Sequence, residues 1–63
     1  MWKVKVYLTW NTSHSFTVAG EKTAKEYAKR IGTEGLWYDD DEVGGKVFVP
    51  VHSVVKIRIY PVR

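Results

Sequence analysis

Residues 1–10 read "MWKVKVYLTW", and apolar and polar side chains alternate along the whole stretch. One parity holds Trp2, Val4, Val6, Leu8 and Trp10, and the other holds Lys3, Lys5, Tyr7 and Thr9. Successive side chains of a β-strand point to opposite faces, so this alternation predicts a half-buried strand. We expect its apolar parity to face the core and its basic and aromatic parity to face outward.

A second stretch with the same pattern lies near the end of the chain, where residues 54–61 read "VVKIRIYP". The alternation predicts a last strand that Pro61 ends, because proline cannot donate to a β-ladder. The expected inward side chains are Val55, Ile57 and Ile59, and the expected outward ones are Lys56, Arg58 and Tyr60.

Between these strands the period of the apolar residues changes. The polar cluster at 11–14 predicts a turn, and a short strand is expected over 15–18 with Phe16 and Val18 inward. Residues 20–32 then show a helical stripe with Gly32 just beyond it, where glycine favours a helix end. The members of that stripe are Ala24, Tyr27, Ala28 and Ile31.

The segment 35–51 predicts a β-hairpin, with strands over 36–38 and 46–51. Gly44 and Gly45 suit its turn, since glycine adopts positive φ without strain. Pro50 has no amide proton to donate to a β-ladder, so the returning strand must end there, bend there or lie at the edge of the sheet.

The element order is β-β-α-β-β-β, or β-β-α-β-β if Pro50 only bends one long strand. This order predicts an α+β fold, a mostly antiparallel sheet with one helix packed on one face.

Length and composition limit what this protein can be. Its 63 residues suffice for one small domain, residues 1–63, and the absence of cysteine excludes disulfides and thiolate ligands. The net charge is +3, but five of the seven acidic residues lie between Glu34 and Glu42. The remainder of the chain therefore has a net charge of +8, which favours an anionic partner.

The outward residues of the two terminal strands are the candidate binding site. If these strands share a sheet, they combine cations with flat rings, as surfaces that bind single-stranded nucleic acid do. The predicted nucleic-acid-binding residues are Lys3, Lys5, Tyr7, Lys56, Arg58 and Tyr60. The alternative is an ordinary solvated face of an antiparallel sheet, although such a face normally mixes charges of both signs.

Protein–protein interaction or self-assembly is the second functional class. Six inward apolar residues on the terminal strands exceed what one short helix covers easily, so aromatic side chains are expected in a partner interface. The predicted interface residues are Trp2, Trp10, Trp37 and Phe48. In this interpretation the protein is an accessory or inhibitor protein, or a homodimer.

The sequence contains no convincing catalytic, metal or cofactor site. Residues 39–42 ("DDDE") lack the spacing of a calcium loop and predict a solvated hairpin tip. His14 and His52 have no identifiable third ligand or orienting carboxylate. No apolar run approaches a membrane span, and the alternating start does not resemble a signal peptide. We therefore expect a cytoplasmic, non-catalytic binding module that needs no cofactor or metal and does not bind membranes.

Overall fold

The computed structural model describes all residues, 1–63, and contains five strands, one α-helix and one short 3₁₀ helix. In chain order the elements are β1 (Trp2–Leu8), β2 (Ser13–Val18), α1 (Glu21–Glu34), β3 (Leu36–Asp39), β4 (Lys46–Val49), η1 (Val51–Ser53) and β5 (Val54–Pro61). The predicted α+β class and the longer of the two predicted element orders are confirmed.

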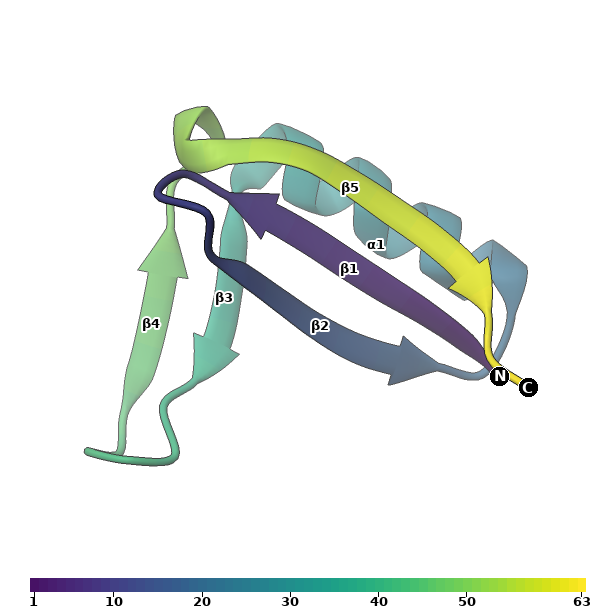
Figure 1. Ribbon diagram of the computed structural model, residues 1–63, viewed down its shortest axis with the longest axis horizontal. Coiled ribbons are helices and arrows are strands. Elements are labelled where there is room, and N and C mark those ends of the chain that lie inside the picture. The colour runs from purple at the N-terminus through teal and green to yellow at the C-terminus, as the bar shows by residue number, and fades with distance from the viewer.

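β1 is the central strand of a three-stranded antiparallel sheet with the order β2-β1-β5 (Figure 1). The terminal strands are therefore neighbours, as the binding-site prediction required. α1 lies behind this sheet and packs mainly against β5 and β1. β3 and β4 form a separate antiparallel hairpin that projects from the end of the sheet where β1 finishes. The two chain ends meet at the opposite end, where the Val62 N–H donates to the Met1 carbonyl at 2.8 Å.

The core is small and lies between the sheet and α1. Its buried residues are Val4, Val6, Val18, Ala24, Ile31 and Leu36. Val4 and Val6 have no exposed surface, because β1 is flanked on both edges and covered on one face by the helix. The apolar parity of the first strand therefore faces the core as far as Leu8, as the alternation predicted. The prediction is wrong for Trp10, because the strand ends at Leu8 and the turn that follows leaves Trp10 92% exposed.

One apolar residue of the last strand is placed differently from the prediction. The β1–β5 register shifts between Tyr7 and Leu8, so Tyr7 faces Lys56 while Leu8 faces Val54. This β-bulge leaves Val55 without a partner on β1 and 64% exposed. The prediction that Val55 packs inward is thus wrong, and Val54 packs against the core in its place.

The helix runs beyond its predicted end. Gly32 lies inside α1, and the helix instead finishes at Gly35, whose N–H donates to the Ile31 carbonyl at 3.0 Å. Gly35 has φ 95° and ψ −177°, a conformation that is essentially restricted to glycine. It directs the chain straight into β3, where Leu36 enters the core.

The hairpin β3–β4 is close to its prediction but shorter at the return strand. Gly44 and Gly45 have φ values of 78° and 82°, which confirms the predicted glycine turn. The return strand was predicted to reach residue 51, but β4 stops at Val49 and Pro50 leads into η1. A two-stranded hairpin is only marginally stable alone, so its attachment to the core through Leu36, Tyr38 and Val49 is what holds it.

The two glycines around the end of α1 provide a matched test of this account. A Cβ on Gly35 would lie 2.5 Å from the Val49 carbonyl oxygen, whereas a Cβ on Gly32 would meet nothing within 4 Å. We expect Gly35→Ala to lower the free energy of unfolding, because backbone strain alone costs about 1–3 kcal/mol. The clash of the added Cβ with the Val49 carbonyl oxygen should increase this loss. Gly32→Ala should raise it by roughly 0.5–1 kcal/mol, because alanine favours a helix interior.

Urea unfolding followed by circular dichroism measures both effects. Equal stability of the two variants would contradict the placement of the helix end at Gly35.

Candidate nucleic-acid interface

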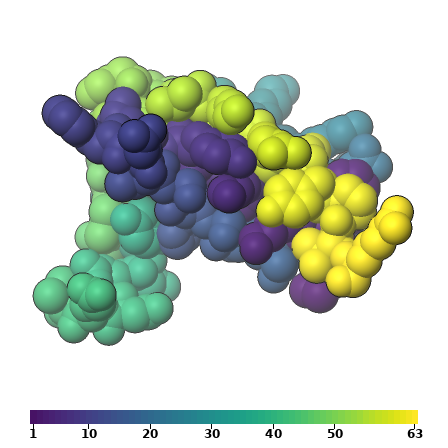
Figure 2. All heavy atoms as spheres, in the orientation of Figure 1, coloured from purple at the N-terminus to yellow at the C-terminus, as the bar shows by residue number.

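The outward residues predicted on the two terminal strands form one continuous surface, which we call the basic face. In the β1–β5 register the opposed pairs are Lys3 with Tyr60, Lys5 with Arg58 and Tyr7 with Lys56. Directly opposed residues point to the same side of an antiparallel sheet, so all of these side chains lie on the surface away from α1. Figure 2 shows this side of the molecule, with β1 in purple and β5 in light green to yellow.

The basic face brings like charges together without a compensating carboxylate on either strand. Lys5 and Arg58 are directly opposed, an arrangement that is unfavourable in a sheet. Neither cation is paired with an acid, because the ion pairs of the structure join Lys25 to Glu21 and Lys46 to Asp39. The fold therefore keeps concentrated positive charge here at some cost in stability.

The tyrosine rings partly offset this repulsion. The Lys5 and Lys56 ammonium groups lie 5.2 and 4.8 Å from the centre of the Tyr7 ring, and the Arg58 guanidinium lies 5.7 Å from that of Tyr60. Such cation–π contacts contribute about 0.5–1 kcal/mol each at exposed sites. The rings thus hold the cations as a cluster instead of letting them spread apart.

β2 adds a third row of polar groups that the sequence analysis did not include. The outward residues of β2 are Ser13, Ser15 and Thr17, which face Tyr7, Lys5 and Lys3 across the β1–β2 ladder. Serine and threonine hydroxyl groups are common hydrogen-bond donors to phosphate oxygens. The alternation in "SHSFTV" indicates that these three residues share one face of a strand. Only the strand order shows that this strand borders the basic face.

The four predicted interface aromatics lie in three separate places. Trp2 is half-buried and packs against the core, while Trp10 is 92% exposed in the β1–β2 turn. Trp37 and Phe48 are opposed across the β3–β4 hairpin, with ring centres 4.7 Å apart. The structure therefore pairs two of these residues and separates the others.

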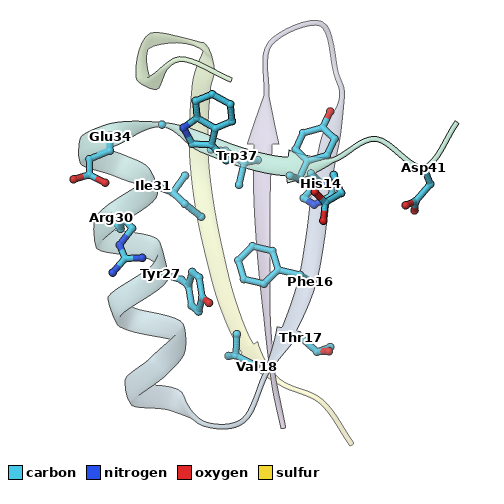
Figure 3. Close-up of a pocket in the computed structure, with 14 residues that line it drawn as sticks. His14, Phe16, Thr17, Val18, Tyr27, Arg30, Ile31, Glu34, Trp37 and Asp41 are labelled. Carbon is cyan, nitrogen blue, oxygen red and sulfur yellow. The ribbon is translucent and has the colours of Figure 1, made fainter. Parts of the chain in front are cut away.

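A groove of about 700 Å³, which we call the aromatic groove, lies on the opposite side of the sheet from the basic face and is lined in part by His14, Phe16, Tyr27 and Tyr38. α1 covers β1 and β5 more than β2, so the inner side of β2 remains open between α1 and β3. Phe16 and Tyr27 point toward one another across this groove, with ring centres 5.2 Å apart (Figure 3). His14 stacks on Tyr38 at 4.1 Å near its β3 end.

The acidic hairpin loop forms structural contacts. One Asp40 carboxylate oxygen accepts hydrogen bonds from the Glu42 and Val43 N–H groups, and Lys46 donates to Asp39 at 2.7 Å. The Lys46 ammonium lowers the pKa of Asp39 through this hydrogen bond and through its charge. No group of three or more histidine, aspartate and glutamate side chains is arranged to hold a metal ion.

Comparison of the chain with protein-family models, with curated proteins and with solved structures finds no significant match. No helix in the structure has both the length and the apolar character that crossing a bilayer requires.

Tyr7 offers a spectroscopic probe of the basic face. Hydrogen bonding from Arg58 to its phenolate oxygen lowers the pKa of Tyr7 below the usual 10.0, and the charges of Lys5, Arg58 and Lys56 lower it further against the effect of desolvation. Between this lowered pKa and 10.0 the unfolded chain binds more protons, so ionised Tyr7 adds stability as the pH rises. That contribution disappears as the pH falls through the folded-state pKa.

Ultraviolet titration of tyrosinate absorbance tests this prediction. One of the four tyrosines should ionise before the others, Tyr7→Phe should remove that early phase, and Arg58→Gln should move it to higher pH. An early phase that persists in Tyr7→Phe would contradict the assignment.

Proposed function

We propose that this protein is a non-catalytic binding module that contacts single-stranded nucleic acid through the basic face. The observation that supports this most strongly is the β1–β5 register, which opposes Lys5 to Arg58 and Tyr7 to Lys56. Four cations and two tyrosines share one surface, and neither strand contributes an acid to it. A face that served only for solvation would be more stable with charges of both signs.

Each group on the basic face suits a different part of the polymer. The ammonium and guanidinium groups attract phosphates, and the serine and threonine hydroxyls of β2 donate to phosphate oxygens. Tyr7 and Tyr60 supply rings on which bases stack, at about 1–3 kcal/mol per base. Contacts of these kinds carry little sequence information, so we expect binding with low sequence specificity.

A charge-matched pair of variants tests the proposal. Lys5→Glu/Arg58→Glu removes two cations from the basic face, while Lys22→Glu/Lys29→Glu makes the same change in net charge on exposed positions of α1. For single-stranded DNA or RNA we expect the first variant to bind far more weakly. The slope of log affinity against log salt should also become shallower by about 1.4, or about 0.7 per lost phosphate contact.

Fluorescence anisotropy at several salt concentrations measures both quantities. The first variant keeps a like-charged pair opposed across the strands but loses the Lys5–Tyr7 and Arg58–Tyr60 contacts, so its unfolding midpoint is measured as well, to show that the variant is folded when its binding is tested. Equal weakening in both variants, or in neither, would contradict a site on the basic face.

The aromatic groove and the exposed hairpin rings support a second candidate, protein–protein interaction or self-association. Trp37 is 63% and Phe48 44% exposed, and the outer edge of β2 has no strand partner. Exposed rings and open strand edges are common features of partner interfaces.

If copies assemble in this way, light scattering should show a mass that rises with protein concentration, and Trp37→Ala should reduce that mass. A monomeric mass at all concentrations would contradict self-association.

A further inference from the structure

A second concavity, of about 420 Å³, lies at the end of the basic face where β1 turns into β2. The β1–β2 turn forms one side of it and the start of β5 forms the other; Tyr7 and Lys56 of the basic face also line it. This volume is within the range of roughly 300–1,000 Å³ that small-ligand pockets occupy. The concavity therefore extends the basic face with a hollow large enough for one flat ring system.

Trp10 lines this concavity in a backbone conformation that is unusual for a bulky residue. Its φ is 66° and that of Asn11 is 57°, both in the left-handed region that disfavours large side chains. Trp10 is also 92% exposed, so burial of the indole does not compensate for the strain. Glycine or asparagine would suit this position better if the turn had only to reverse the chain.

The strained turn is also held firmly in place. The Leu8 N–H donates to the Thr12 carbonyl at 2.8 Å, and the Thr12 hydroxyl donates to the Thr9 carbonyl at 2.8 Å. The Thr9 N–H reaches across to the Ser53 carbonyl of η1 at 3.1 Å. Trp10 thus projects from a fixed platform at one corner of the sheet, where the dark-blue turn stands out in Figure 2.

The β-bulge on β5 shapes the other side of the same concavity. It exposes Val55 there and places Lys56 opposite Tyr7, with the Lys56 ammonium 4.8 Å from the tyrosine ring. Bulges commonly redirect side chains next to functional sites. Two independent departures from regular sheet geometry, the left-handed Trp10 and the bulge at Val55, therefore meet at one hollow beside the cations.

We propose that this concavity binds one unpaired base of a single-stranded nucleic acid, with the indole of Trp10 stacked on the base. This inference rests on the proposed function and names the element of the polymer that the site selects. Lys56, and Arg58 beyond it, hold the phosphates on the adjoining basic face. The Asn11 amide, which also lines the hollow, offers both a donor and an acceptor to the edge of the base.

The geometry distinguishes this ligand from a duplex and from a basic peptide. A base inside a duplex is stacked and paired, so it cannot enter the hollow without the cost of unpairing. No acidic residue lines the concavity, and the surface that continues from it is cationic, which suits a polyanion and not a basic peptide.

The test compares two short oligomers of equal length and charge, one of thymidine nucleotides and one built from abasic sites. The abasic oligomer reports phosphate contacts alone, and the ratio of the two affinities reports base binding. We expect the wild-type protein to bind the thymidine oligomer about tenfold more tightly, the lower part of the range for one stacked base.

Trp10→Gly should reduce this affinity ratio to about one without weakening binding of the abasic oligomer. Glycine relieves the backbone strain, so the variant should be at least as stable as the wild type. Trp10→Phe should keep most of the wild-type affinity ratio, because the smaller phenylalanine ring still stacks on the base. Trp37→Ala, which removes the other well-exposed tryptophan, should leave the ratio unchanged.

The outcomes separate this inference from the proposed function. Equal, salt-dependent affinity of the wild type for both oligomers would overturn the base pocket and leave the basic face as a phosphate site. An unchanged ratio in Trp10→Gly would also overturn it. Failure of both oligomers to bind would overturn the proposed function itself.

Discussion

β1 pairs with β2 along one edge and with β5 along the other, so its side-chain period determines what lies on each face of the sheet. Antiparallel partners place directly opposed residues on the same side. Every β1 residue therefore imposes its direction on one residue of each neighbour. A slip of one residue on the β5 edge would bury lysine and arginine and expose isoleucine, and a slip on the β2 edge would expose Phe16 and Val18, which makes the register strongly determined.

The two faces that result have opposite physical character. The inner face contributes Val4, Val6 and Val18 to a core of only six buried apolar residues, and α1 and β3 supply the other three. Because α1 packs mainly against β5 and β1, the inner side of β2 stays open as the aromatic groove. The outer face instead gathers cations that repel one another, held in place by tyrosine rings. A small domain with so thin a core has little stability to spare, so this concentration of charge is the feature that most needs a functional explanation.

Much of this arrangement follows from the sequence, and the exceptions have physical causes. Alternation in residues 2–10 was sufficient to predict which side of β1 faces the core. On the last strand Val54 and Val55 are both apolar, so the pattern could not indicate which of them the bulge would expose. Gly32 and Gly35 both suit a helix end, and the choice between them depends on tertiary packing of Leu36.

The candidate site was predictable to a similar extent. The alternating pattern of each strand was enough to name the residues of the basic face. Which of them lie opposite one another depends on the strand order, which one sequence does not reveal. Trp10 was assigned to an apolar interface because it continues the parity of β1. Local turn geometry overrides that parity, since the strand ends at Leu8 and the left-handed turn exposes the indole beside the basic face.

We propose that nucleic acid binds to the outer face of the sheet and not to the groove behind it. The most direct measurement is a residue-by-residue amide chemical-shift map of the protein titrated with a short single-stranded oligonucleotide. The account predicts shifts concentrated in β1, β5 and the β1–β2 turn, with α1 and the β3–β4 hairpin nearly unchanged. Shifts concentrated around the groove between α1, β2 and β3, or no saturable shifts at all, would contradict it.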